Sequence, residues 1–452
     1  MKKVLLAAGV SLFFTLTSSC QSIPTLPPPK STLGIYKPGP AAAQTGTLKA
    51  EENLSSSTFT IEPTLTASPT ETQTHTPVPS VTPTLPPTPT QPPTPTQPLD
   101  EYNAYLQNVT RESITIMWQT PLRYSWSKLR YRLMGDPSWI EEFISEKTKF
   151  HEISLLGLSP DTTYEYQVSM DGTSQWSPSQ PAFFTTAPDA SQTFRAAIYG
   201  DSQTRSDVHR EVIQSISQNE PDILIHAGDF IQYGMNYEDW DEEFFHPAAD
   251  LIAYVPLYPV IGNHEYNGEE RMWYYDFFSP PGNEQWYAFT YGCARFVILD
   301  SNFRFTPGSE QYTWLVEEFQ SSGYINSNWQ IVLLHHPPYT SSSHLGTEVP
   351  TAEYLVPLFE ENGVDLVFSG HNHGYERSNK DGIYYIVTGG GGGWLYGFSN
   401  VDLNPYSQVR NQINHHTTLD FHCSEDYLEL NAWDISLNLI DGPVVLDTQT
   451  DE

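Results

Sequence analysis

Five short apolar stretches recur along the C-terminal half of the chain, and a polar motif begins at the end of each. The stretches read FRAAIYG, DILIHAG, PLYPVIG, WQIVLLH and VDLVFSG. Apolar runs of this length that close on a turn residue are typical of buried strands. The motifs are Gly200-Asp201, Gly228-Asp229, Gly262-Asn263-His264-Glu265, Val332-Leu-Leu-His335 and Gly370-His371-Asn-His373. Because ligands bind at the carboxyl ends of strands in open α/β sheets, the five motifs predict strand ends that share one site.

As candidate ligands the motifs offer two carboxylates, one amide and three imidazoles from neighbouring strand ends: Asp201, Asp229, Asn263, His335, His371 and His373. Oxygen and nitrogen donors in this mixture suit Fe, Zn or Mn, and two such ions can share a bridging carboxylate. A single Gly-Asp or Gly-Asn-His is common by chance. The specific signal is the ordered set of five, which predicts a centre for two divalent or trivalent metal ions.

Helix-like stretches alternate with these strands from about residue 192 onward. They read SDVHREVIQSISQ, SEQYTWLVEEF and AEYLVPLFEEN. Such alternation predicts sheets covered by helices. We therefore expect an α/β domain over 189–452, in which helices cover the sheets.

The preceding segment, 100–188, has an all-β pattern. In SITIMWQT, Ile114, Ile116 and Trp118 alternate with other residues, as a half-buried strand requires. This segment resembles a fibronectin type III sandwich, and its Leu-Ser-Pro-Asp-Thr-Thr-Tyr164 run is similar to that family's tyrosine corner. We expect a structural role for it.

The N-terminal region lacks the composition of a folded domain. Residues 1–20 have a basic start, a short apolar core and a Thr-Ser-Ser-Cys20 end, which resembles a bacterial lipoprotein signal. Residues 21–99 hold 18 of the 37 prolines, which predicts an extended stalk. We expect an exported protein of the cell envelope, anchored by a lipid on Cys20 to the outer face of a bacterial membrane. The alternative is a soluble secreted protein.

Charge and cysteine content narrow the possibilities further. The chain has 21 basic and 54 acidic side chains, a net charge of −33. Such a surface repels a phosphate backbone, so nucleic-acid binding is not expected. Besides Cys20 only Cys293 and Cys423 remain, and the sequence leaves open whether they form a disulfide or two buried thiols.

Taken together, the motifs resemble those of the calcineurin-like metallophosphoesterases over 192–440. The resemblance implies that the α/β domain is a β-sandwich flanked by helices. With the all-β segment in front, 102–440 resembles the purple acid phosphatases and their bacterial relatives. The resemblance implies a first metal held by Asp201, Asp229 and His373. It implies a second metal held by Asp229, Asn263, His335 and His371, with Asp229 as the bridge.

Two positions depart from the pattern of those families. The purple enzymes have a ferric-iron tyrosine three residues after the bridging aspartate, where this chain has Gln232, and Tyr233 comes one residue late. A one-residue slip in extended chain reverses the side-chain direction, so we favour a packed aromatic at Tyr233 over a ligand. Other relatives place a histidine two residues after the first aspartate, where this chain has Gln203, which could bind weakly or hydrogen-bond Asp201. We expect a loosely held first metal without purple colour.

Other polar residues near the motifs have expected roles outside the set of ligands. His264 and His344 resemble substrate-facing histidines that contact the phosphoryl group or protonate the leaving oxygen. His226 and His336 are expected to support the site. The run Gly389–Gly393 predicts a close backbone turn beside the metals.

The expected activity is hydrolysis of a small phosphate ester, in the first place a monoester, by a metal-activated water. Two alternatives remain open at this point. The same ligands serve phosphodiesterases. A degenerate domain could also bind phosphorylated ligands without turnover, as the glutamines at 203 and 232 would favour.

Overall fold

The computed structural model describes residues 104–172, 175–266, 272–344, 348–399 and 404–447. The predicted signal segment, Cys20 and the predicted stalk lie outside these residues. In the described part of the chain no helix is both long enough and apolar enough to span a membrane.

The first described domain is a sandwich of two antiparallel sheets, as the alternating pattern predicts. One sheet has the strand order β1-β2-β5 and the other β4-β3-β6-β7. Their bounds are β1 Tyr105–Gln107, β2 Ser113–Tyr124, β3 Ser127–Leu133, β4 Ile140–Ile144, β5 Thr148–Leu156, β6 Thr163–Ser169 and β7 Trp176–Thr185. Trp118 is buried between the sheets, and the Tyr164 hydroxyl accepts the backbone N–H of Ser159 at 2.9 Å. That return bond is the one a tyrosine corner makes.

The second domain is built on two larger sheets. The six-stranded sheet has the order β10-β9-β8-β18-β19-β20 and the seven-stranded sheet the order β11-β12-β13-β14-β16-β15-β17. The first comprises β8 Phe194–Tyr199, β9 Ile223–His226, β10 Leu257–Pro259, β18 His415–His422, β19 Tyr427–Asp434 and β20 Leu439–Asp447. The second comprises β11 Tyr287–Tyr291, β12 Ala294–Leu299, β13 Trp329–Leu334, β14 Leu366–Ser369, β15 Tyr375–Lys380, β16 Ile383–Thr388 and β17 Ser407–Asn411.

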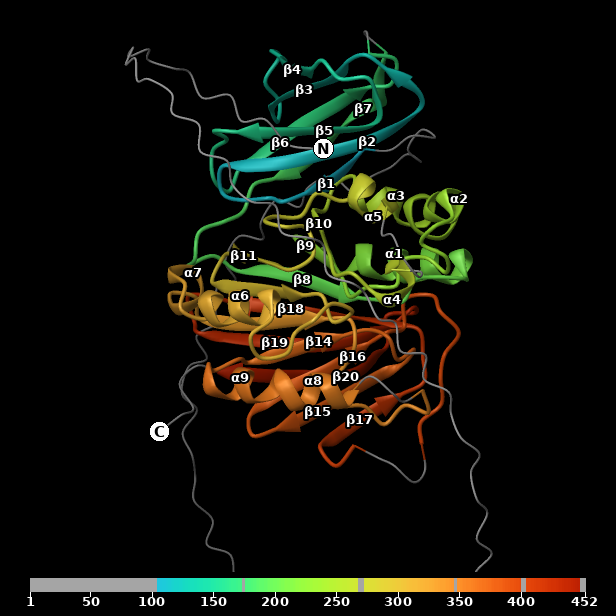
Figure 1. Cartoon of the computed structure of the whole chain (residues 1–452). Helices are drawn as coiled ribbons and strands as arrows, with labels where there is room; N and C mark the ends of the chain where they lie inside the picture. Colours follow the sequence, from blue (N-terminus) through green and yellow to red (C-terminus); the bar gives the residue numbers. More distant parts are fainter. Residues whose placement is uncertain (1–103, 173–174, 267–271, 345–347, 400–403, 448–452) are drawn as a thin grey trace, which may run out of the picture. The chain divides into compact units, whose positions relative to one another are not determined.

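Helices cover the outer faces of these sheets (Figure 1). Beside the six-stranded sheet are α1 Ser206–Gln218, α2 Tyr237–Asp239, the π-helical turn η1 Trp240–Phe245 and α3 His246–Ile252. The remaining helices are α4 Asn263–Tyr266, α5 Met272–Phe277, α6 Glu310–Glu318, α7 Ser322–Ile325, α8 Glu348–Tyr354 and α9 Val356–Glu361. The expected sandwich flanked by helices is confirmed.

The apolar runs are buried on both faces, which is why they read as nearly continuous hydrophobic stretches. In β8, Ala196 and Ile198 belong to the core between the sheets, whereas Ala197 and Tyr199 belong to the core under the helices. Strands β10, β9 and β8 are parallel neighbours, and so are β13 and β14. The motif-bearing strands of each sheet therefore end on the same edge.

One predicted helix is divided. The helix-like stretch AEYLVPLFEEN, residues 352–362, contains the end of α8 and all of α9, which lie on either side of Leu355. Pro357 lies in the first turn of α9, where its missing N–H and fixed φ are tolerated. In the interior of one long helix the proline ring would clash with a carbonyl of the preceding turn, so the helix is interrupted before Pro357.

The two sheets are also joined covalently. Cys293, directly before β12, forms a disulfide with Cys423, directly after β18, across 130 residues of chain. The sequence left this pairing open. Because β12 is parallel to β13, the bond lies at the opposite end of the sandwich from the motif-bearing strand ends. It fixes the spacing of the sheets at that end.

We predict that the double change Cys293→Ser and Cys423→Ser lowers stability without removing any candidate ligand. Loss of a cross-link over a loop this long lowers the free energy of unfolding by up to about 5 kcal/mol, if the bond acts by restricting the unfolded chain. Thermal unfolding should show a lower midpoint, and a reductant should lower the midpoint of the wild type but not that of the double variant. Equal midpoints for the two proteins would exclude a stabilising disulfide.

Candidate metal centre

All six predicted ligands lie at one edge of the sandwich, and both sheets contribute. Asp201, Asp229 and Asn263 follow β8, β9 and β10 of the six-stranded sheet. His335 directly follows β13, and the His371–His373 loop follows β14, in the seven-stranded sheet. The structure therefore brings together residues that are separated by up to 172 positions.

Three of these residues have a left-handed backbone. The φ angle is +60° at Asp201, +57° at Asp229 and +65° at His371. For residues with a side chain this region costs roughly 1–3 kcal/mol, and such strain clusters at functional sites. Here the turn is fixed from the neighbouring segment, since His371 N–H donates to Asp201 Oδ2 at 2.9 Å and His264 N–H donates to Asp229 Oδ1 at 2.9 Å.

The donor atoms expected at the second metal converge closely. Asn263 Oδ1 lies 3.1 Å from His335 Nε2 and 3.0 Å from His371 Nδ1. His335 Nε2 also lies 3.1 Å from Asp229 Oδ2. The other nitrogen of His335, Nδ1, is 2.8 Å from the carbonyl of Ala227, which orients Nε2 toward the carboxylate.

The donors expected at the first metal include buried oxygens that need a partner. Asp201 Oδ1 lies 3.4 Å from His373 Nε2 and has no hydrogen bond within the described residues. Gln203 is buried, its Nε2 is 3.4 Å from the same His373 atom, and its Oε1 likewise has no hydrogen bond there. Buried oxygens in native proteins are almost always satisfied, so a cation at this position accounts for both. Asp201, Asp229 and His335 each offer a ligand atom within 4.8 Å of the others. The residues present thus fit a metal centre.

Asp229, the expected bridging ligand, and its neighbour His335 have strongly shifted pKa values. Burial disfavours the charged form of His335, but the Asp229 carboxylate outweighs it and raises the pKa of His335 to about 10. Although burial opposes it, the same contact holds the pKa of Asp229 well below its ordinary value. A metal ion needs the imidazole deprotonated, so binding would displace a proton from this pair.

The two candidate substrate-facing histidines lie beside the ligands. His264 Nδ1 is 2.7 Å from the carbonyl of Gln232, and its Nε2 is 3.8 Å from Asp229 Oδ2. His344 is exposed, and its ring centroid is 5.0 Å from that of His371.

The two supporting histidines are buried. His336 bonds the Ser301 hydroxyl through Nδ1 at 2.8 Å, and its ring centroid lies 4.4 Å from that of His371. His226 lies 3.0 Å from the hydroxyl of Ser202, the residue after Asp201. His226 thus contacts the segment that bears Asp201, whereas His336 also offers a ligand atom within 4.8 Å of those of His335 and His371.

Tyr233 corrects one expectation. Its side chain is 59% exposed, so it is not the packed aromatic that we favoured. The residue before it, Gln232, accepts a hydrogen bond from Thr204 Oγ1 through Oε1. At the position where the purple enzymes have their tyrosine, the amide oxygen of Gln232 is thus bonded to Thr204.

The glycine run makes the close turn that the sequence predicted. Gly391 N–H donates to the carbonyl of Gly200 and Gly393 N–H to that of Asp201, both at 2.8 Å. A Cβ at Gly392 would lie 2.4 Å from the carbonyl of Ser202, and one at Gly393 would lie 2.5 Å from the His373 ring. Side chains are excluded at these positions because the glycine run packs directly against the backbone of Ser202 and the imidazole ring of His373.

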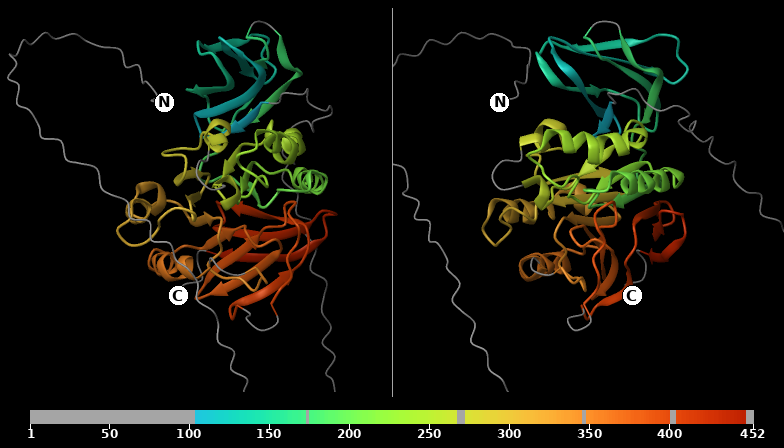
Figure 2. Two further views of the ribbon diagram at one scale, coloured as in Figure 1. Left: turned by 45° about the vertical axis from the view of Figure 1, so that its right-hand side comes forward. Right: turned by 90° about the vertical axis from the view of Figure 1, so that its right-hand side faces the viewer.

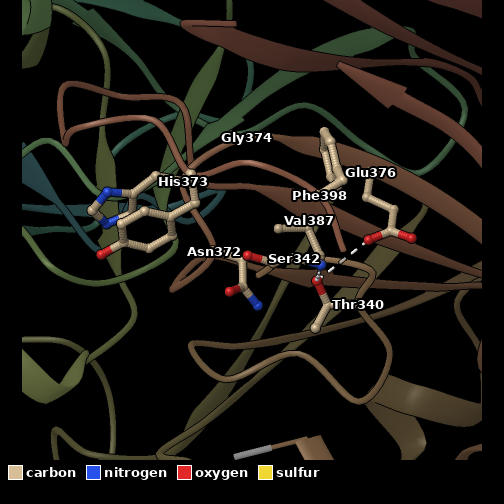
Figure 3. A pocket seen from close by; sticks show the side chains of 9 residues that line it. Thr340, Ser342, Asn372, His373, Gly374, Glu376, Val387 and Phe398 are labelled. Atoms are coloured by element: carbon tan, nitrogen blue, oxygen red, sulfur yellow. Dashed lines mark hydrogen bonds between the residues drawn. The ribbon is translucent and has the colours of Figure 1, made fainter. Parts of the chain in front are cut away.

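Behind the His371–His373 loop is a small cavity of about 10 Å³ (Figure 3). Asn372 is buried beside it, together with Thr340 and Glu376. Glu376 accepts hydrogen bonds from the backbone N–H and the hydroxyl of Ser341, both at 2.6 Å. It therefore braces the segment that leads to His344 rather than the His371–His373 loop itself.

Glu265 is a structural determinant that the sequence did not identify, although it ends the Gly-Asn-His-Glu motif. Its buried carboxylate accepts backbone N–H groups from Asp229 at 3.0 Å, Phe230 at 2.9 Å and Gly262 at 2.7 Å. Burial, followed by the neighbouring Asp229, raises the pKa of Glu265 to about 7. The side chain ties the Asp229 turn to the start of α4.

We predict that Glu265→Gln lowers both stability and metal content, because an amide offers one acceptor oxygen where three N–H donors need two. The loss in unfolding free energy should be about 2 kcal/mol. Thermal unfolding and metal analysis would measure it, with Glu317→Gln on the exposed side of α6 as the control. A Glu265→Gln variant with full metal content and unchanged stability would contradict this role.

Comparison with known proteins finds a family match within each of the two domains. Residues 194–375 match the model of the calcineurin-like phosphoesterase family, and residues 100–186 match that of the purple acid phosphatase N-terminal domain. Purple acid phosphatase 15 of Arabidopsis thaliana is 28% identical over 286 residues, which cover 54% of this chain and 53% of that protein. Probable purple acid phosphatase 20 of the same plant is 27% identical over 286 residues, covering 58% and 64%. The chain thus spans less than two thirds of the length of either relative.

Among solved structures, the purple acid phosphatase PPD1 from yellow lupin superposes with a TM-score of 0.67 at 20% identity. The match covers 76% of this chain and 74% of the lupin protein, and at that identity it speaks for the fold alone. The two family matches are consecutive in the chain. Residues 194–375 are thus similar to calcineurin-like phosphoesterases, and residues 100–186 are similar to the N-terminal domain of purple acid phosphatases.

Proposed function

We propose that the protein is a metal-dependent hydrolase of phosphate esters, with phosphomonoesters as its substrates. The observation that carries the proposal is the convergence of six donor residues from two sheets, among which the buried Asp201 Oδ1 has no hydrogen bond within the described residues. The family matches support the same reaction class.

We assign Asp201, Asp229 and His373 to a first metal ion, with Gln203 as a weak neutral ligand. Asp229, Asn263, His335 and His371 would hold the second. When bound, two such ions supply Lewis acidity toward the phosphoryl oxygens and lower the pKa of the attacking water.

The protein's own residues would orient the ester and handle its proton. His264, beside Asp229, would donate a hydrogen bond to a phosphoryl oxygen. As water adds to phosphorus and the ester P–O bond breaks, the exposed His344 would give its proton to the leaving oxygen. The products are inorganic phosphate and an alcohol. Two histidines so placed favour a monoester, whose phosphoryl group presents three free oxygens.

Paired variants test this assignment. Asp229→Ala should remove most metal and abolish turnover, because it deletes the shared ligand. His344→Ala should keep both metals and lower kcat by about 10²-fold, as expected for loss of a general acid. Metal analysis and steady-state rates with a chromogenic monoester and the matching diester would separate these effects.

Full turnover by the Asp229→Ala variant would refute the metal assignment. Faster cleavage of the diester than of the monoester would replace the monoesterase proposal with a phosphodiesterase. A wild-type protein with one metal or none and no turnover would instead indicate a binding protein for phosphorylated ligands.

We further propose export and attachment to the cell envelope through a lipid on Cys20, with residues 21–99 as a spacer. The signal-like sequence motivates this, and a disulfide in the folded part is compatible with an oxidising compartment. Cell fractionation of the wild type and a Cys20→Ser variant tests the anchor: a variant that remains in the membrane fraction would contradict it.

The fibronectin type III likeness of the first domain also stays a proposal, supported by its tyrosine-corner bond.

A further inference from the structure

The first metal position lacks a strong ligand at both places where related enzymes have one, yet an aromatic ring lies against its histidine. Tyr396 stacks on His373 with ring centroids 4.2 Å apart and an interplanar angle of 9°. Tyr396 belongs to the segment that follows the glycine run Gly389–Gly393. This segment is distinct from those that contain positions 203 and 232.

The same ring also contacts the candidate acid. His344 stacks on Tyr396 with centroids 5.0 Å apart and an angle of 29°. Tyr396 is half-buried, whereas His344 is exposed. The three rings therefore form one continuous stack, with a candidate metal ligand at one end and a candidate substrate-facing residue at the other.

Backbone bonds fix Tyr396 relative to the ligand. Tyr396 N–H donates to the carbonyl of His373 at 2.8 Å. Two residues earlier, the carbonyl of Trp394 lies 2.8 Å from His373 Nδ1, which leaves Nε2 facing Asp201. His373 is thus held by its main chain, its ring nitrogen and its ring face, all from one segment.

That segment is itself anchored to the loop after β8, which bears Asp201. The Arg205 guanidinium donates to the carbonyl of Gly392 at 2.7 Å and to that of Gly393 at 2.6 Å. Gly393 N–H in turn donates to the carbonyl of Asp201. Ligand orientation by surrounding groups of this kind is worth about 10–100-fold in metal affinity.

We propose that Tyr396 is a positioning residue that holds His373 toward the first metal and seats His344 over the site. In this way its ring fixes the orientation of His373, which compensates for the missing strong ligand at positions 203 and 232. The inference rests on the proposed metal site but does not require a particular substrate.

Two variants separate the ring from the hydroxyl. Tyr396→Phe keeps the stack, whereas Tyr396→Leu removes it. Tyr131→Leu is the matched control, because Tyr131 is likewise partly buried and packs on an aromatic ring, Tyr164, in the all-β domain. Each protein would be titrated with Zn²⁺ against a competing chelator, and the visible spectrum of its Co²⁺ form would be recorded.

We expect Tyr396→Leu to weaken the more loosely held metal about 10–100-fold and to change the Co²⁺ spectrum, while the tighter metal is unaffected. Tyr396→Phe and Tyr131→Leu should match the wild type in both measurements. In turnover, the leucine variant should lose kcat more than it changes KM, and the phenylalanine variant should recover it.

The inference is overturned if Tyr396→Leu binds both metals as the wild type does, with the same Co²⁺ spectrum. It is also overturned if Tyr396→Phe loses the metal to the same extent, since the hydroxyl and not the stack would then be responsible. A wild type that binds two metals but cleaves no phosphate ester would defeat the proposed activity and leave the titration result standing.

Discussion

The candidate site depends on the face-to-face packing of two sheets, because neither sheet contributes enough donors alone. Aromatic side chains contribute to that contact: Phe194 of β8 meets Tyr291 of β11 with centroids 4.9 Å apart, and Phe421 of β18 meets Phe296 of β12 at 6.1 Å. Burial of such surface is the main source of stability. A small shift between the sheets would separate Asp229 from His335, which come from different sheets.

The strand ends and their polar residues were predictable because the information is local. An apolar run followed by Gly-Asp or by histidine identifies both the strand and the point where its side chain leaves the core. The helix α1 was predicted with its observed bounds for the same reason, since its periodicity is contained in 13 residues. Local pattern failed at Pro357, where one proline divided an otherwise continuous helical stretch.

Contacts between segments that are distant in the sequence were not predictable. The pairing of Cys293 with Cys423 and the stacking of Tyr396 on His373 depend on tertiary distances that no spacing in the sequence encodes. The direction of Tyr233 was also missed, because alternation specifies a side chain's face only within a regular strand, and this residue lies in a turn. Glu265 was overlooked because it offers its charge to backbone amides instead of to the candidate ions.

The order of strands in the six-stranded sheet has a consequence for biosynthesis. β8 bears Asp201 at its end and pairs on one side with β9, but its other neighbour is β18, which lies more than 200 residues later in the chain (Figure 2). Until residues 415–422 have been made, β8 has one edge with no partner from its own sheet. Open edges of apolar strands invite pairing with other chains. A nascent or truncated chain that stops before β18 is therefore an aggregation hazard, and the domain completes its fold only once nearly all of it has been synthesised.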